Sequence, residues 1–156
     1  MNDGDAALQR LLDKDEIVDL VHRYSYFVDH KRADEVVALF TQDCVVDYGP
    51  GMRLPVRAVF GSARTEGSPG FVVTSHHNAN VLVKFEGNDR AVVRTSVYAW
   101  HQMTDGEAPR LWGYYHDVVV RTPEGWRFSE RVLRVAGQEH WDMAWRPLVD
   151  PEDAYS

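Results

Sequence analysis

The stretch "FVVTSHHNANVLVKFEGNDRAVVRTSVYAWHQM", residues 71–103, decides the fold. Two long runs rich in β-branched and aromatic residues, Phe71–Phe85 and Arg90–Met103, flank the polar turn "EGND". A link this short between two long strands predicts antiparallel pairing. Pairing through this turn is expected to place His76 opposite Ala99.

Polar side chains, including His76 and His77, interrupt the first of these strands. Successive side chains of a strand point to opposite faces, so only one of the two imidazoles can face the interior. On the second strand Ala91, Val97 and His101 share a face that suits the lining of a cavity. The expected register turns His76 toward that cavity, about one diagonal step from His101, whereas a slip by one residue would turn His77 inward.

The rest of the chain predicts an α+β layout. Residues 111–122 and 126–136 read as two more strands, joined through "TDGEAP" and "PEG". Helical periodicity covers residues 6–30, with Asp13 and Glu16 resembling a capping box that would restart the helix internally. A second short helix is expected over residues 34–40.

Smaller elements complete this expectation. "CVVDYGPG" is expected to be a short strand, Val56–Phe60 a short helix and "TEGSPG" a mobile loop. Helices before a long meander predict N-terminal helices packed on one face of a curved, antiparallel sheet. One domain is expected over residues 1–137, and the tail 138–156 should pack on it or on a neighbouring subunit.

Composition narrows the possible functions. The 156 residues favour one domain, and the net charge of −7 offers no basic stripe for nucleic acid. No apolar run approaches the ~20 residues of a membrane span. No signal peptide is apparent, so a cytoplasmic protein is expected. The one cysteine, Cys44, cannot form an internal disulfide and is expected to be buried. Aromatic residues on the outer strand face and in the tail predict a homo-oligomer, either dimer or trimer.

Four polar residues form the candidate site. Asp29 ends the first helix, Tyr48 ends the first strand, and His76 and His101 lie in the sheet. A carboxylate, two imidazoles and a phenol make a complete acid–base set. A carboxylate bound to one imidazole nitrogen fixes the tautomer and leaves the other nitrogen basic. Taken singly, each residue also has a purely structural interpretation.

Other kinds of site find little support. No glycine-rich phosphate loop follows a strand, and no serine lies in a nucleophile elbow, so no cofactor is expected. A zinc site formed by His76, His101 and His116 is the one metal alternative, but no ligand spacing supports it. We therefore expect no metal.

Three segments, "YSYFVDHKRADEVVALFTQDCVVDYG", "TSHHNANV" and "GYYHDVVVRTPEGWRF", resemble the SnoaL-like branch of the nuclear transport factor 2-like superfamily. The resemblance covers most of residues 8–136 and implies a cone-shaped α+β fold. Members carry many activities, so the fold alone does not give the reaction.

The resemblance to scytalone dehydratases extends to single residues. Asp29 matches their helix-end aspartate, His76 their catalytic histidine and His101 a second histidine. Tyr48 matches one of two tyrosines that hold a water against the substrate carbonyl. The chain also departs from that pattern, so scytalone itself is not the expected substrate. The second tyrosine is replaced by Val28, with Tyr24 or Tyr26 able to reach the same space, and a serine and an asparagine are replaced by Asp117 and Val119.

The resemblance implies a cofactor-independent dehydratase or isomerase acting on a small, hydrophobic cyclic carbonyl compound, polyketide- or steroid-like. The spacing of Tyr24 and Asp29 also resembles bile-acid dehydratases, which act on steroid enones. His76, oriented by Asp29, would remove the proton alpha to the carbonyl. Tyr48 would stabilise the enolate, and His101 or protonated His76 would then protonate the departing hydroxyl.

The predicted catalytic residues are Asp29, His76, His101 and Tyr48. The predicted substrate-binding residues are Tyr24, Tyr26, Val28, Val97, Tyr115 and Asp117. Two alternatives stay open, a non-catalytic ligand-binding domain and a polyketide cyclase that uses Asp29 as its acid.

Overall fold

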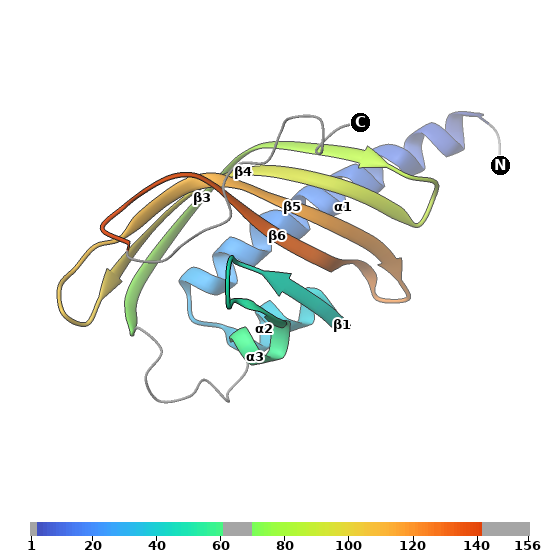
Figure 1. The fold of residues 1–156 in the computed structure, drawn as a ribbon. Coiled ribbons are helices and arrows are strands. Elements are labelled where there is room, and N and C mark those ends of the chain that lie inside the picture. Colours follow the sequence, from blue (N-terminus) through green and yellow to red (C-terminus); the bar gives the residue numbers. More distant parts are fainter. Residues whose placement is uncertain (1–2, 61–69, 142–156) are drawn as a thin grey trace.

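A long helix and a six-stranded sheet form most of the molecule. The computed structural model describes residues 3–60 and 70–141. In chain order the elements are α1 (Asp3–Asp29), α2 (Ala33–Ala38), β1 (Phe40–Asp47), β2 (Arg53–Pro55), α3 (Val56–Phe60), β3 (Phe71–Phe85), β4 (Arg90–Met103), β5 (Arg110–Thr122) and β6 (Gly125–Glu139). Figure 1 shows α1 crossing one side of the curved sheet, with α2 and α3 close to β1.

The strand order is β2-β1-β6-β5-β4-β3. The meander from β3 to β6 is antiparallel throughout, as predicted, whereas β1 pairs with β6 in parallel. The sheet is therefore mixed at one edge, and α1 packs mainly on β3 at the other edge. The predicted α+β fold class, with helices covering one face of a curved sheet, is confirmed.

The register of β3 against β4 is the predicted one, with His76 opposite Ala99. A bulge between Ala79 and Leu82 then shifts the pairing, and Asn80 adopts a φ of 51° there. Asparagine tolerates this left-handed conformation better than most residues. The bulge changes which positions face inward, so His76 before it and Val83 after it both point toward the interior.

The core lies between α1 and the inner face of the sheet. Its fully buried members include Ile17, Leu20 and Val21 of α1, with Val93, Val119, Trp126 and Phe128 of the strands. Burial of each such side chain contributes roughly 1.5–3 kcal/mol. This packing fixes the position of the last turns of α1 above β3, where the candidate site lies.

The predicted internal restart of the first helix is wrong, because α1 runs unbroken from Asp3 to Asp29. Asp13 and Glu16 bind the sheet instead of capping a helix. Glu16 accepts the Trp126 backbone N–H at 2.9 Å, and Asp13 forms an ion pair with Arg121 at 2.7 Å.

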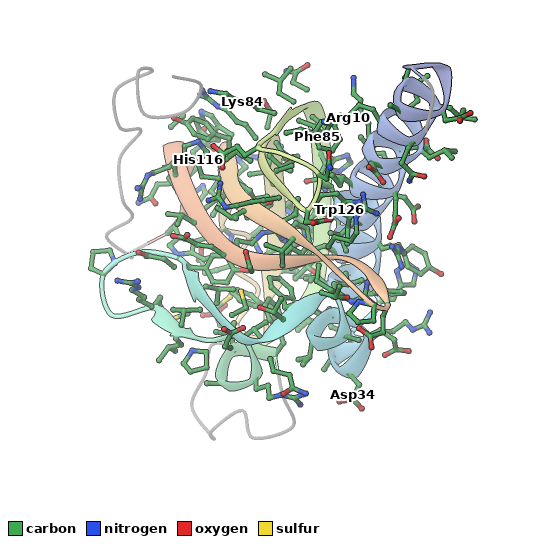
Figure 2. All side chains as sticks on the ribbon, turned by 90° about the vertical axis from the view of Figure 1, so that its right-hand side faces the viewer. Arg10, Asp34, Lys84, Phe85, His116 and Trp126 are labelled. Atoms are coloured by element: carbon green, nitrogen blue, oxygen red, sulfur yellow. The ribbon has the colours of Figure 1, made fainter. Side chains whose placement is uncertain are left out.

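The N-terminal half of α1 makes a further contact with the ends of the strands. Arg10 lies over the Phe85 ring at 4.2 Å, and the rings of Phe85 and Trp126 are 6.1 Å apart. Figure 2 shows these three labelled residues gathered at one end of the molecule. The helix is therefore held near its middle by an arginine and two carboxylates and at its C-terminus by the residues of the candidate site.

Other expectations differ in detail. The helix at Val56–Phe60 is confirmed, but α2 ends at Ala38 because Leu39 already accepts a hydrogen bond from Phe128 of β6 at 3.0 Å. The strand β2 was not predicted. β6 continues to Glu139, past the predicted end of the domain, since it still pairs with β5 there.

Most of the loop expected around "TEGSPG" and residues 142–156 of the tail lie outside the described residues. Trp141, which precedes them, packs on Phe71 with ring centroids 5.9 Å apart. The outer face of the sheet exposes Tyr98 and Trp112, and self-association through it stays a prediction. Cys44 is buried as expected, and this burial raises the pKa of its thiol to about 12.

Candidate active site

Asp29 and His76 form the centre of the candidate site. The Asp29 carboxylate accepts three hydrogen bonds: from His76 Nδ1–H at 2.6 Å, the His76 backbone N–H at 2.9 Å and the Thr74 hydroxyl at 2.9 Å. An ionised carboxylate only accepts hydrogen bonds, so Nδ1 of His76 carries the proton. The other ring nitrogen, Nε2, is then left with the lone pair of a base.

The state of the Asp29 carboxyl follows from these bonds. Burial raises its pKa, but the hydrogen bonds from His76 and Thr74 and the charge of His76 outweigh burial and hold the pKa below its usual value. Asp29 is therefore ionised at neutral pH. It can orient His76 and stabilise an imidazolium, but it is poorly suited to donate a proton.

The geometry of helix and strand explains why this pair meets. Ser25 and Asp29 are four residues apart on α1, about 6 Å along the helix, and Asn78 and His76 are two apart on β3, about 6.6 Å along the strand. The two spacings match, so Asn78 Nδ2 donates to Ser25 Oγ at 2.6 Å while His76 meets Asp29. His77 is exposed on the opposite face, as the predicted register required, and its ring lies 6.0 Å from Tyr98.

His101 lies beside this pair. Its ring is perpendicular to that of His76, with centroids 5.4 Å apart, and packs between Phe71 and Trp141. Burial, helped by the nearby His76, lowers the pKa of His101 from 6.5 to about 4. His101 is therefore neutral at physiological pH, and its Nδ1 has no hydrogen-bond partner among the described residues. We call Asp29, Thr74, His76 and His101 the dyad cluster.

The predicted tyrosines form a second, deeper group. The hydroxyls of Tyr24 and Tyr48 are 2.8 Å apart and buried. The rings of Tyr24 and Tyr115 meet edge to face at 5.8 Å. Burial raises the pKa of Tyr48 and of Tyr115 well above their usual value, so both phenols stay protonated and can donate hydrogen bonds.

Arg131 completes this second group and was missed from the sequence. Its guanidinium donates to both carboxylate oxygens of Asp117, each at 2.8 Å, and lies over the rings of Tyr24 at 3.9 Å and Tyr115 at 4.2 Å. Burial lowers the pKa of Arg131 and raises that of Asp117, and the pairing opposes both effects. The pKa of Arg131 ends well above its usual value, whereas burial outweighs the pairing for Asp117, whose pKa stays raised. On β6, Arg131 alternates with outward-facing residues in the same way as the buried Leu133 and Val135. This alternation in the sequence could have predicted that Arg131 faces the interior.

We call Tyr24, Tyr48, Tyr115, Asp117 and Arg131 the phenol cluster. No hydrogen bond joins it to the dyad cluster among residues 3–60 and 70–141. Ala99 lies opposite His76, and Thr95, four residues earlier on β4, lies opposite Tyr115, so the backbone positions of His76 and Tyr115 are roughly 13 Å apart along the strand direction.

The other predicted substrate-binding residues differ in burial and in the partners they already have. Tyr26 is 52% exposed and stacks on His30; two residues after Tyr24, it lies on another side of the helix, and its contact with substrate stays a prediction. Both oxygens of Asp117 bind Arg131, which gives this carboxylate a partner within the protein. Val97 is buried and Val28 is partly buried against the core, and contact of either with substrate stays a prediction.

The zinc alternative fails on geometry. His116 lies beside Tyr114, on the side of the sheet away from α1 (Figure 2), whereas His76 and His101 face α1. These three imidazoles therefore cannot share one ion. Within the described part of the chain, no group of three His, Cys, Asp or Glu side chains is placed to hold a metal. None of the helices described is long and apolar enough to cross a membrane.

The family is shown by comparison with known sequences. Residues 9–132 match the SnoaL-like domain family. The chain belongs to the SnoaL-like family. The predicted nuclear transport factor 2-like fold is confirmed by its solved relatives.

Three known proteins are similar to this chain in sequence or in fold. A crystal structure from Novosphingobium aromaticivorans, provisionally identified as a scytalone dehydratase, is 31% identical with a TM-score of 0.82, covering 91% of this chain and 97% of that one. An uncharacterized protein of Mycobacterium tuberculosis is 27% identical over 139 residues, 81% of this chain and 87% of the relative. A hexachlorocyclohexane dehydrochlorinase from Novosphingobium barchaimii is 15% identical with a TM-score of 0.75. The match covers 93% of this chain and 99% of that one and shows a shared fold.

Proposed function

We propose that this SnoaL-like protein is a cofactor-independent lyase or isomerase that acts on a hydrophobic cyclic carbonyl compound. The observation that carries the proposal is the 2.6 Å hydrogen bond between Asp29 and the Nδ1 of His76. It leaves Nε2 of His76 as an oriented base, and the adjacent carboxylate stabilises the imidazolium that forms when this base takes a proton.

In the proposed reaction, His76 Nε2 removes the proton alpha to the substrate carbonyl, and the C–H electron pair moves into an enolate. The enolate then expels a beta hydroxyl, which takes a proton and leaves as water, giving an enone. In an isomerisation the same proton returns to a different carbon. Each acid–base step contributes roughly 10²–10⁴-fold to the rate.

The proton that the leaving hydroxyl needs comes from protonated His76 in this scheme. His101 was the other expected donor, but with a pKa of about 4 it is neutral near pH 7 and therefore a poor general acid. Asp29 is ionised for the reason given above, which also disfavours a cyclase that uses Asp29 as its acid. In this scheme neutral His101 contacts the substrate instead of protonating it.

The phenol cluster supplies donors for the developing enolate oxygen. The hydroxyls of Tyr48 and Tyr24 are buried and bonded to each other, and the raised pKa of Tyr48 keeps its phenol a donor, as a preorganised oxyanion site requires. In this scheme the substrate reaches from His76 to these hydroxyls, directly or through water. A fused-ring compound fits this requirement, and the dehydratase name of the relative at 31% identity agrees with loss of water.

Proton abstraction can be tested without knowing the natural substrate. The protein is incubated in D₂O with a cyclic ketone such as 2-tetralone, and exchange of the alpha protons is followed by NMR. We expect enzyme-dependent exchange that falls about 10²–10⁴-fold in H76A and in D29N. H77A is the matched control, since His77 lies on the same strand but points outward, and it should keep the full rate.

The same experiment separates the alternative function, ligand binding without catalysis. A binding protein would bind the ketone but would not accelerate exchange, and H76A would then change nothing but affinity. Equal exchange rates for the parent protein and H76A would refute the proposed role of His76.

A further inference from the structure

Lys31 has an unusual backbone conformation at the end of α1. Its φ is 58°, in the left-handed region where glycine is the usual residue. The helix ends there with two hydrogen bonds, from the Lys31 N–H to Val28 O at 3.1 Å and from the Arg32 N–H to Phe27 O at 2.9 Å. This pair of bonds is the Schellman ending, and a lysine at its left-handed position is disfavoured relative to glycine. Disfavoured conformations of this kind concentrate at functional sites.

The conformation places the Lys31 side chain at the dyad cluster. Its ammonium Nζ lies 3.5 Å from Thr74 Oγ1, the hydroxyl that donates to Asp29 Oδ1 at 2.9 Å. The residue itself is exposed, so its charge sits where the dyad cluster meets solvent. One threonine hydroxyl thus separates the positive charge of Lys31 from the carboxylate that orients His76.

The charge of Lys31 also affects His101, on the other side of the dyad cluster. After burial and His76, it is one of the groups that lower the pKa of His101. His101 is 6% exposed, and its Nδ1 has no hydrogen-bond partner in the described ranges. A buried polar atom without a partner normally has its hydrogen bond supplied by water or by a ligand.

These features together carry an inference about the substrate that rests on the proposed function. We propose that Lys31 binds an anionic oxygen of the substrate, so that the substrate is a cyclic carbonyl compound bearing a carboxylate or an acidic phenol. The anionic group lies at the solvent edge beside Lys31, while the apolar rings extend inward past His76. The Lys31 ammonium lies at this exposed edge of the dyad cluster, so its charge favours an anionic group there.

The test uses two probes of the same size, 2-naphthoate and its neutral analogue 2-naphthamide. Binding is measured by calorimetry in low-salt buffer. We expect 2-naphthoate to bind the parent protein about 10-fold more tightly, with the preference declining as salt screens the charge. K31Q should remove the preference, K31R should keep most of it, and K14Q, at an exposed lysine elsewhere on α1, should leave it unchanged.

Glycine at position 31 provides a second measurement. K31G removes the charge and relieves the backbone, so it should lose the preference for 2-naphthoate while its Tm rises by roughly 2–4 °C. A variant that binds less well while folding more stably cannot be explained by damage to the fold. Equal binding of the two probes by the parent protein, no binding of either, or a preference that survives in K31Q and K31G would overturn the inference.

Failure of this inference is distinguishable from failure of the proposed function. H76A should still prefer 2-naphthoate, because Lys31 is intact, although it no longer exchanges alpha protons. If H76A keeps the exchange activity while K31Q loses the preference, the proposed function fails and the role of Lys31 stands. If the preference for 2-naphthoate persists in K31Q while H76A abolishes exchange, the role of Lys31 fails and the proposed function stands.

Discussion

At the scale of single residues, burial of an ionisable side chain ties folding to pH. His101 has its pKa lowered from 6.5 to about 4, because burial disfavours the imidazolium. Between these values the unfolded chain binds more protons than the folded chain. The contribution of His101 to stability is therefore complete above pH 6.5 and is lost as the pH falls toward 4.

This dependence predicts the behaviour of H101F. Phenylalanine keeps the ring packing with Phe71 and Trp141 but removes the titration. On going from about pH 7.5 to about pH 5, the parent protein should lose roughly 2 kcal/mol more of its unfolding free energy than H101F does. Urea unfolding at the two pH values measures this difference. The control H22F, at an exposed histidine of α1, should follow the parent, and the same loss in H101F would contradict the assignment.

At the scale of elements, α1 is attached to the sheet by specific carboxylates as well as by its apolar face. Asp13 forms an ion pair with Arg121 and accepts hydrogen bonds from Gln9 and Trp126. Burial raises the pKa of Asp13, but these bonds outweigh it and lower the pKa below its usual value. Because α1 carries Asp29 at its other end, this attachment also helps to place the dyad.

Replacement of Asp13 should therefore destabilise the fold more than loss of an ordinary surface ion pair. We expect D13A to lower the unfolding free energy by about 1–3 kcal/mol, since it leaves the Trp126 indole N–H without its acceptor and removes one of the two carboxylates that pair with Arg121. D19A breaks the exposed pair with Arg23 on the same helix and should cost less than about 0.5 kcal/mol. Urea denaturation of both variants compares them, and equal effects would mean that Asp13 acts only as a surface charge.

At the scale of the whole molecule, Arg131 connects elements that are far apart in the sequence. Its guanidinium binds Asp117 of β5 and lies over the ring of Tyr24 of α1, and its backbone pairs with Val46 of β1. Both members of the Arg131–Asp117 pair are fully buried. Removal of one member leaves the other charge buried and uncompensated.

We expect R131M to lower the unfolding free energy by about 3–5 kcal/mol. The double variant D117V/R131M should be more stable than R131M alone, because it removes the uncompensated carboxylate as well. E139A, which breaks the exposed pair with Arg110, should cost less than about 1 kcal/mol. Chemical denaturation of the three variants tests this order, and R131M as mild as E139A would show that the buried charge is satisfied in another way.

Much of the fold was accessible from local patterns. The strands Phe71–Phe85 and Arg90–Met103 have the predicted bounds, because apolar and polar residues alternate along them and a short turn fixes their antiparallel register. That register alone turned His76 inward and His77 outward. The single-residue resemblances of Asp29 and His76 led to the same pair that the structure joins by a hydrogen bond.

What the sequence could not supply were contacts between distant segments. The change of inward-facing positions at Asn80 comes from a bulge, which depends on the facing strand. Asp13 and Glu16 resemble a helix cap in the sequence, and only the fold places Arg121 and Trp126 beside them. Tyr26 and Tyr24 are equivalent by composition, and only the packing of α1 exposes one and buries the other.

The sequence by itself therefore determined the order of the main elements and the register of β3 against β4, which follow from periodicity, turn length and residue type acting over a few neighbours. The pairing of Asp29 with His76 was what the resemblance to scytalone dehydratases implied. The tertiary structure alone decided the neutral state of His101, the occupation of Asp117 by Arg131 and the approach of Lys31 to Thr74. Each of these depends on burial or on a charge brought close by folding, and neither can be read from positions along the chain.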